Sequence, residues 1–393
     1  MRIAHLITRM IIGGAQENTL YNCEDLIRLF GDEVLLVTGP ALGPEGDLLQ
    51  QGRGEGVPTQ IVSSMRRAID PWQDSQSYFE IQRVLREFKP EVVHTHSAKA
   101  GFLGRLAASS LHVPAIVHTV HGAPFHPYQN AASRTLFRWC EWHAARHCHA
   151  LISVADAMTD LMVSAKVAPR EKFTTIYSGM DVEPLLAADS HRQAMRSSLG
   201  YGPEHVVIGK IARLFHLKGH EDVIRAAAEV VKANANVRFL FIGDGVLREK
   251  LQTQIGSAGL AGHFHFAGLV PPSEIPRYIG AMDMLVHTSL REGLPRALPQ
   301  ALIAGKPVVS YDIDGAREVA ISGETGFLVP PRWEELIDPL VRLAGDPLLR
   351  GRLGRTGQAR FADTFRHEFM TRRIRELYER VLSRECERPR QPA

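Results

Sequence analysis

Short apolar segments alternate with longer amphipathic segments along most of the chain. A short apolar run bounded by turn residues predicts a buried strand, whereas apolar positions that repeat with the helical period predict a helix. In the first half these rules predict strands over Ile3–Thr8, Val34–Thr38, Val57–Val62, Val92–His94, Ala115–Thr119, Ala150–Ser153 and Phe173–Ile176. They predict helices from Gly13 and Gly14 to about Phe30 and over Ser75–Phe88, Ala98–Leu111 and Ala131–Ala145. Strands that alternate with helices in this way indicate a parallel sheet with crossover helices.

The alternation lapses around Asp181–Pro184 and resumes after the mixed segment 184–204, which indicates a second domain. The second strand–helix series comprises Val206–Ile211, Val223–Val231, Val237–Ile242, Leu247–Ile255, His263–Phe266, Asp283–Val286, Pro307–Ser310 and Gly326–Val329. A chain of 393 residues is long enough for two domains of ordinary size. The sequence therefore predicts an α/β protein with two doubly wound domains, over 1–183 and 184–365. Their ligands are expected at the carboxyl ends of the strands.

One stretch between two predicted strands combines a short helix with a carboxylate. A proline inside a helix costs about 3 kcal/mol, but it is tolerated in the first turn. Pro299 therefore predicts a helix that begins close to Pro295 and ends at Gly305 as its cap. The free backbone amides of such a helix would lie near Arg296, Ala297 and Leu298. Because a helix start after a strand can bind an anion, and Glu292 lies just upstream, the stretch predicts a site for a phosphate and for hydroxyl groups.

Two cations follow the first strand of the second half. Arg213 and Lys218 are five residues apart at the carboxyl end of Val206–Ile211, so they could grip a diphosphate from one side. The alternative is a pair of solvated loop cations. Gly13 and Gly14 also lie between a strand and a helix, but they do not form the dinucleotide fingerprint G-x-G-x-x-G.

Polar clusters with histidine follow two strands of the first half, at His94–Lys99 and His118–Gly122. Histidines at strand ends can donate hydrogen bonds to sugars or phosphates, or transfer protons. A third group, on the segment after Ala131, comprises Cys140, His143, His147, Cys148 and His149. Trp139 and Trp142 interleave this group and no second ligand pair lies nearby, which disfavours a metal site. Arginines on the same segment form either an ordinary solvated face or a basic face toward anionic lipid, namely Arg134, Arg138 and Arg146.

The net charge of +3 is too small to argue for nucleic acid as a partner. The cysteines are scattered without a C-x-x-C pair, so free thiols in a reducing compartment are expected, and they are Cys23, Cys140, Cys148 and Cys386. No apolar run approaches the ~20 residues of a spanning helix, and the first residues are too polar for a signal peptide. We therefore expect a cytoplasmic protein, with room for peripheral contact at the inner face of a membrane.

Taken in order, these segments resemble motifs of the family-4 glycosyltransferases, which have the GT-B fold, over nearly the whole chain. The matching motifs are Gly13-Gly14, the block His94–Arg105 (His-Thr-His-Ser-Ala-Lys-Ala-Gly-Phe-Leu-Gly-Arg), His118–Gly122, Ser178–Asp181, the Arg213 and Lys218 pair, and residues 292–300. The last of these matches the family's E-x7-E signature except at its final position. The His94–Arg105 block is similar to that of enzymes that extend lipid-linked or surface polysaccharide precursors, commonly from UDP-sugars.

The resemblance implies two Rossmann-like domains that face each other across a cleft. Residues 1–183 would bind the acceptor, 184–365 would bind the nucleotide sugar, and a last helix over roughly 366–384 would cross back onto the first domain. The activity implied is a retaining transfer of a hexosyl or N-acetylhexosaminyl group to a hydroxyl of a saccharide or lipid-linked acceptor. No metal or cofactor is implied, because cationic side chains fill the role often assigned to a metal ion.

The resemblance also assigns roles to single residues. Arg213 and Lys218 would hold the leaving diphosphate, and Glu292 would contact hydroxyls of the donor sugar. The other implied donor-side contacts are Gly13, Gly14 and the backbone of Arg296 and Ala297 at the phosphates, Val270 near the base, Gln300 at the ribose and His121 at the donor sugar. His96 and Lys99 belong to the block implied on the acceptor side.

Gln300 replaces the second glutamate of the signature. Its amide oxygen can still accept a bond from a ribose hydroxyl, but the charge is absent, and the lost charge-assisted bond is worth about 1–2 kcal/mol. This change predicts altered nucleotide recognition rather than lost catalysis. Two other functions stay open: a different GT-B enzyme such as a UDP-sugar 2-epimerase, and a nucleotide-sugar-binding protein without turnover.

Overall fold

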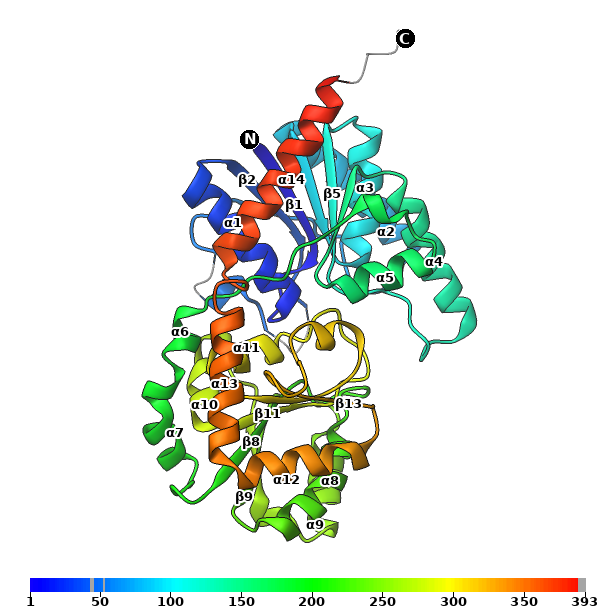
Figure 1. The fold of residues 1–393 in the computed structure, drawn as a ribbon. Coiled ribbons are helices and arrows are strands. Elements are labelled where there is room, and N and C mark those ends of the chain that lie inside the picture. The colour runs from blue at the N-terminus through cyan, green and yellow to red at the C-terminus, as the bar shows by residue number, and fades with distance from the viewer. Residues whose placement is uncertain (43–45, 52–53, 388–393) are drawn as a thin grey trace. The chain divides into compact units, whose positions relative to one another are not determined.

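The computed structural model describes residues 1–42, 46–51 and 54–387, which form two compact units (Figure 1). The first unit comprises Met1–Met180 together with the chain from Arg366 onward, and the second comprises Asp181–Phe365. The chain thus passes between units after Met180, whereas the sequence pattern placed the joint between residues 183 and 184. Among the described residues, no helix combines the length and the apolar character needed to cross a membrane.

The first unit is built on a seven-stranded parallel sheet with the order β3-β2-β1-β4-β5-β6-β7. Its strands are β1 (Arg2–Arg9), β2 (Glu33–Gly39), β3 (Thr59–Ile61), β4 (Val92–His96), β5 (Ala115–Val120), β6 (Ala150–Ser153) and β7 (Phe173–Thr175). Each strand that the hydrophobic pattern predicted in the first half is confirmed. β3 is shorter than predicted and is exposed along its length, because it lies at the edge of the sheet.

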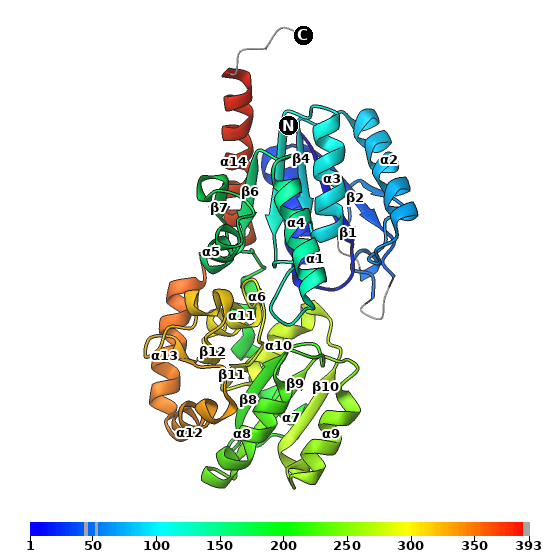
Figure 2. The same ribbon diagram turned by 90° about the vertical axis from the view of Figure 1, so that its right-hand side faces the viewer.

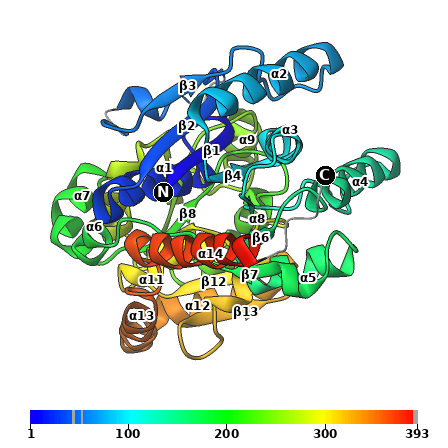
Figure 3. The ribbon, with the colours of Figure 1, turned by 90° about the horizontal axis from the view of Figure 1, so that it is seen from above.

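Helices cover both faces of this sheet, and Figure 3 shows α14 on one side of β1 and β4 and α3 on the other. The helices of the unit are α1 (Gly14–Phe30), α2 (Pro71–Phe88), α3 (Ala98–Ser110), α4 (Ala131–Ala145), α5 (Asp156–Ser164) and α14 (His367–Glu387). Figure 2 shows α4 beside α3. α2 begins four residues before the predicted Ser75, because the side chain of Asp70 accepts bonds from the amides of Trp72 and Gln73 and Pro71 suits the first turn.

The last helix, α14, packs against α1 (Figure 1). Nδ1 of His367 bonds to a carboxylate oxygen of Asp25 at 2.7 Å, and Arg375 bonds to Asp32 at 2.9 Å. Apolar side chains of α14 also enter the core of the first unit, namely Met370, Ile374, Leu377, Tyr378 and Val381. The amino-terminal unit is therefore completed by the chain's last helix.

The second unit has a six-stranded parallel sheet with the order β10-β9-β8-β11-β12-β13. Its strands are β8 (Val206–Ile211), β9 (Val237–Ile242), β10 (Phe264–Gly268), β11 (Met284–His287), β12 (Val308–Tyr311) and β13 (Gly326–Val329). Its helices are α6 (Glu183–Leu186), α7 (Arg192–Ser198), α8 (His220–Ala233), α9 (Arg248–Ser257), α10 (Ile275–Ala281), α11 (Ala297–Ile303), α12 (Ile337–Gly345) and α13 (Pro347–Phe361). The predicted class, an α/β protein with two doubly wound sheets, is confirmed.

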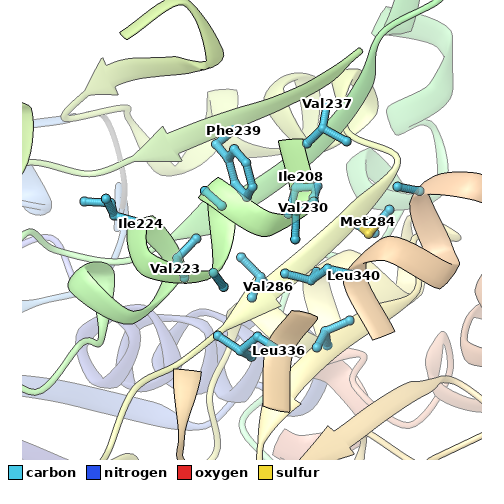
Figure 4. Packing of buried hydrophobic residues seen from close by; sticks show 14 of the residues in the cluster. Ile208, Val223, Ile224, Val230, Val237, Phe239, Met284, Val286, Leu336 and Leu340 are labelled. Atoms are coloured by element: carbon cyan, nitrogen blue, oxygen red, sulfur yellow. The ribbon is translucent and has the colours of Figure 1, made fainter. Parts of the chain in front are cut away.

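Figure 4 shows one side of the second sheet packed against helices. Ile208 of β8 and Val286 of β11 belong to the same buried cluster as Val223 of α8 and Leu340 of α12. Side chains alternate between the two faces of a strand. Lys210, two positions after Ile208, and Thr288, two positions after Val286, therefore lie on the same face of the sheet as this cluster, nearer the carboxyl ends of the strands.

Candidate active site

Both sheets reverse their strand order next to their first strand. β1 lies between β2 and β4, and β8 lies between β9 and β11. Loops that leave two such neighbouring strands diverge to opposite faces of the sheet, and the crevice between them is the usual ligand site of doubly wound folds. In the second unit, Arg213 and Lys218 follow β8, whereas Glu292 and Gln300 follow β11. The structure therefore brings these predicted residues to the two sides of one switch point.

The loops after β8 and β11 are held together by hydrogen bonds to backbone carbonyl oxygens of the loop after β8. The amide of Leu290 donates to the carbonyl oxygen of Leu217 at 2.8 Å, and the hydroxyl of Thr288 donates to that of Gly219 at 2.6 Å. Gly219 has a φ of 65°, and a Cβ there would lie 2.1 Å from the carbonyl oxygen of Thr288. Only glycine permits both the conformation and the close approach.

Across this junction the amine of Lys218 pairs with the carboxylate of Glu292. The side chains of both residues are about one-fifth to one-quarter exposed, at 20% and 24%. The sequence motifs imply that the two residues meet different parts of a ligand, and they do not predict that the two side chains contact each other. Their spacing is set by the fastened backbones, so the pair forms a fixed positive and negative charge beside each other.

A third loop, after β12, supports Glu292 from behind. The amide of Glu292 donates to Oδ2 of Asp314 at 2.7 Å, and the amide of Gly315 donates to the carbonyl oxygen of Gly293 at 3.1 Å. Burial raises the pKa of Asp314, while the bond from the amide of Glu292 opposes this shift. Asp314 was not predicted as a site residue, although an Asp-Gly pair after a strand is a turn signal that marks this position in the sequence.

Helix α11, which follows the loop after β11, begins as predicted near Pro295, but one of the amides expected to be free is already hydrogen-bonded. The amide of Leu298 donates to the carbonyl oxygen of Pro295 at 3.1 Å, so the prediction that it is available for an anion is wrong. This bond belongs to the turn at the start of α11. Gln300 is half-buried on this helix, and its side-chain amide makes no hydrogen bond to the described residues.

The carboxyl end of α11 agrees with the prediction for Gly305. This residue has a φ of 71°, and its amide donates to the carbonyl oxygen of Leu302 at 2.9 Å. The next amide, of Lys306, donates to that of Ala301 at 2.8 Å. This is the two-bond arrangement of a Schellman cap.

Arg213 and Val270 lie at the same edge of the second sheet. The guanidinium of Arg213 is exposed and stands 5.2 Å from the ring centre of Phe215. Gly245 packs against this loop, because a Cβ there would lie 2.6 Å from the carbonyl oxygen of Leu214. Val270 is buried just after β10, two strands away from β8. The edge thus extends from the charged switch point to an apolar position further along the sheet.

The corresponding edge of the first unit carries a chain of hydrogen-bonded histidines. Nδ1 of His5 lies 3.1 Å from Nε2 of His96, and Nδ1 of His96 lies 3.1 Å from Nε2 of His121. Burial lowers the pKa of His5 to about 3 and that of His96 well below its usual range, so both rings are neutral at pH 7. His96 is fully buried, and of the three rings only His121 is partly exposed. His96 therefore cannot contact a ligand directly, and it can influence one only through its hydrogen bond to His121.

The other predicted residues of the first unit lie around this chain. Gly13 precedes α1 with extended backbone, and Gly14 is the first residue of the helix. The amine of Lys99 bonds to the carboxylate of Asp74 and to the carbonyl oxygen of Ala68. Lys99 is thus held against the start of α2.

Two groups of possible metal ligands occur among the described residues: His5 with His94 and His96, and Asp25 with His367 and Glu368. Both ring nitrogens of His94 already have partners, since they lie 2.5 Å from the hydroxyl of Tyr378 and 2.7 Å from that of Thr119, whereas Nε2 of His5 has no partner among the described residues. The Cys140–His149 segment does not form such a group in the described part of the chain. Burial raises the pKa of the Cys23 thiol, and the side chain of Cys386 lies outside the described residues.

Two family profiles match the chain. One, described as a glycosyl transferase 4-like domain, matches residues 13–179, and the other, described as glycosyl transferases group 1, matches residues 191–360. Together they span more than half of the chain and both of its units. The chain belongs to the family-4 glycosyltransferases. The resemblance inferred from the motifs is confirmed, and the two doubly wound units of this glycosyltransferase have the GT-B fold.

Named relatives of this glycosyltransferase are named for the transfer of different sugars. It is 28% identical over 353 residues to the UDP-Gal:alpha-D-GlcNAc-diphosphoundecaprenol alpha-1,3-galactosyltransferase of Escherichia coli, covering 89% of each chain. It is 29% identical to the alpha-D-kanosaminyltransferase of Streptomyces kanamyceticus, covering 69% of this chain and 72% of that one. The crystal structure of Anabaena Alr3699/HepE in complex with UDP and glucose superimposes with a TM-score of 0.82 at 21% identity, covering 96% of this chain and 99% of that one.

Proposed function

We propose that this glycosyltransferase moves a sugar from a UDP-sugar to a hydroxyl of a saccharide or lipid-linked acceptor, with retention of the anomeric configuration, in surface polysaccharide or glycan biosynthesis. The observation that carries the proposal is the fastened pair of Lys218 and Glu292 at the switch point, with Arg213 on the same loop. The Escherichia coli relative is named for UDP-galactose and a diphosphoundecaprenol acceptor, and the Anabaena structure contains UDP and glucose. Both names agree with a UDP-sugar as donor.

In the proposed reaction, negative charge develops on the leaving diphosphate as the glycosidic bond breaks. Arg213 and Lys218 stabilise this charge, and their preorganised positions lower the barrier because they need no rearrangement during the step. Glu292 accepts hydrogen bonds from hydroxyls of the donor sugar. A leaving phosphate oxygen takes the proton of the acceptor hydroxyl, so no side-chain nucleophile is required, and the cations make a metal ion or other cofactor unnecessary.

The remaining contacts follow the same assignment. The backbone of Gly14, Arg296 and Ala297 approaches the phosphates, Val270 lies near the base and Gln300 meets the ribose. In the first unit, His121 faces the donor sugar, and the neutral histidine chain behind it fixes which of its nitrogens carries a proton. A neutral imidazole donates from one nitrogen and accepts at the other, so each ring in the chain constrains the next.

The test is release of the nucleoside diphosphate from a panel of donors, with and without a crude lipid-linked acceptor fraction. The proposal expects release that depends on the acceptor and that persists with a chelator. Tight donor binding without release under any acceptor would indicate a binding protein instead. Conversion of the free UDP-sugar to an epimer without an acceptor would indicate an epimerase.

Exchange of Gln300 for glutamate tests the ribose assignment. Because a charge-assisted bond to a hydroxyl is worth about 1–2 kcal/mol more than a neutral one, we expect Gln300→Glu to bind UDP about tenfold more tightly in calorimetry. Gln252→Glu, at an exposed position on α9, adds the same charge elsewhere and serves as the control. Equal affinities of Gln300→Glu and the parent protein would show that this side chain does not meet the nucleotide.

A lipid-linked acceptor requires contact with a membrane, and α4 supplies a suitable face. Leu136, Trp139 and Trp142 are 51%, 52% and 39% exposed, while Ala144 and Ala145 face the core. A hollow beside them is lined by both tryptophans and by two cationic side chains, those of Arg138 and Lys166. Aromatic side chains flanked by cations bind at the interface of an anionic bilayer. We propose that this α4 face contacts anionic lipid at the cytoplasmic side of a membrane.

Sedimentation with vesicles tests this face. Because burial of one large apolar side chain is worth about 1.5–3 kcal/mol, we expect the double variant Trp139→Ala/Trp142→Ala to bind vesicles containing phosphatidylglycerol at least tenfold more weakly. Trp72→Ala is the matched control, since Trp72 is 74% exposed on α2. Equal losses in both variants, or equal binding to vesicles of phosphatidylcholine alone, would contradict the proposed face.

A further inference from the structure

A lysine occupies a core position of the second unit. Lys210 lies two residues after Ile208 on β8, in the row that faces α8, and it is 1% exposed. The preceding members of the row, Val206 and Ile208, are apolar and buried. Lysine is almost never fully buried unless it is paired, so this position calls for a specific reason.

The amine of Lys210 is connected to the loop that carries Lys218. It donates to the hydroxyl of Thr288 at 2.7 Å. That hydroxyl lies 3.3 Å from the carbonyl oxygen of Lys218 and 2.6 Å from that of Gly219. The side chain of Thr288 therefore links the amine of Lys210 to the loop after β8.

Several buried polar atoms near Lys210 have no hydrogen-bond partner among the described residues. Both ring nitrogens of His220, Nε2 of His287 and the hydroxyl of Ser289 are buried without a hydrogen-bond partner among the described residues. An ammonium group has three hydrogens to donate, and among the described residues Lys210 has a single hydrogen bond. The amine of Lys210 can therefore be protonated or neutral without the loss of its bond to Thr288.

The charged and titratable groups around Lys210 come from four segments. They are Lys218 in the loop after β8, His220, Glu221 and Asp222 on α8, His287 on β11 and Glu292 in the loop after β11. Burial, together with the charge of Lys218, lowers the pKa of Lys210 to about 7, while Asp222 and Glu292 oppose the shift. Burial also lowers the pKa of His220 and of His287, so these rings are neutral.

We propose that Lys210 is a positioning residue and a third positive charge of the diphosphate site, and that it takes up a proton from solvent when a nucleoside diphosphate binds. The inference rests on the proposed function, because it places the diphosphate beside Lys218. Negative charge brought to the Lys218 loop stabilises the ammonium form of Lys210 behind it. The protonated amine in turn holds Thr288 and, through it, the carbonyl oxygens of Lys218 and Gly219. Donor binding and proton uptake are thereby coupled.

The experiment is calorimetry of UDP binding at pH 8 in two buffers whose ionisation enthalpies differ, such as phosphate and Tris. The difference between the two apparent enthalpies gives the number of protons taken up. We expect uptake approaching one proton per UDP at pH 8 and little uptake at pH 6, where Lys210 is already protonated. In Lys210→Met, which removes the amine and keeps an unbranched side chain in the core, the uptake at pH 8 should vanish and the affinity should fall.

Two further variants complete the design. Lys210→Arg keeps a permanent charge, so it should bind UDP without proton uptake, and it covers the case in which Lys210→Met does not fold. Lys232→Met removes an exposed lysine of α8, whose side chain is 79% exposed, and should leave the uptake unchanged. UDP binding by the parent protein without uptake, or uptake that persists in Lys210→Met or Lys210→Arg, would overturn the inference and leave the proposed function standing. If neither UDP nor GDP binds, the proposed function itself fails, and the inference fails with it.

Discussion

Replacement of Arg213 by alanine is expected to lower acceptor-dependent release of the nucleoside diphosphate by about 10²- to 10³-fold, the loss typical for one preorganised group that stabilises charge in a transition state. Lys218→Ala should cause a loss of the same order. The side chain of Arg213 is exposed, so its removal leaves the core intact and the effect should appear in turnover rather than in stability. The measurement is the steady-state rate of diphosphate release at saturating acceptor, with thermal unfolding as a check on folding.

The control variants for this prediction lie on the neighbouring helix α8. Arg225 and Lys232 are exposed there with side chains 57% and 79% accessible, and each pairs with an acidic residue one helical turn earlier. Arg225→Ala and Lys232→Ala remove the same charges from the same unit without touching the switch point, so their rates should match the parent protein. Equal losses in all four variants would assign the effect to net charge and contradict the specific role of Arg213 and Lys218.

The second large effect is expected on stability, at a buried ion pair of the first unit. Arg105 on α3 donates to Glu141 on α4 at 2.9 Å and to the carbonyl oxygen of Gly101 at 2.7 Å, and its side chain is 0% exposed. Removal of one partner leaves the other charge buried and unpaired, which costs about 3–5 kcal/mol. Arg105→Ala should therefore destabilise the first unit by about that amount in denaturant unfolding.

Tryptophan fluorescence can follow this unfolding, because Trp72, Trp139 and Trp142 all lie in the first unit. The exposed pair of Arg170 and Asp160 is the control, and Arg170→Ala should change the stability by no more than about 1 kcal/mol. The double variant Arg105→Met/Glu141→Leu replaces both charges by apolar groups and should be more stable than either single removal. A double variant as unstable as Arg105→Ala would show that packing, rather than the unpaired charge, causes the loss.

The hydrophobic pattern predicted most strands of the two sheets because strands such as β8 and β9 lie in short apolar runs, whereas β3 and β7 are short and more polar. It predicted helix ends less well where a side chain outside the apolar repeat decides them, as Asp70 does for α2. The site was predicted in its members but not in its contacts. Arg213, Lys218 and Glu292 were found from motifs, yet their association depends on β8 and β11 being neighbours, which a local pattern does not encode.

Burial explains the other differences. His96 was predicted to face a ligand because it follows a strand, but its ring is enclosed by two other histidines. Lys210 was not singled out, although it breaks a row of apolar residues at alternate positions of a strand, and that break is a signal available in the sequence. Asp314 acts on Glu292 only because two loops meet, so it could not be assigned before the order of the strands was known.

The position of α14 has a consequence for biosynthesis. During translation the ribosome produces all of the second unit before α14, because Asp181–Phe365 precede this helix in the chain. Met370, Ile374 and Tyr378 of α14 supply part of the core of the first unit. Until then the sheet side that α14 covers is exposed, and the nascent amino-terminal unit cannot reach its final stability. The carboxyl-terminal unit, which is continuous in sequence, can fold first and therefore matures in the opposite order to its synthesis.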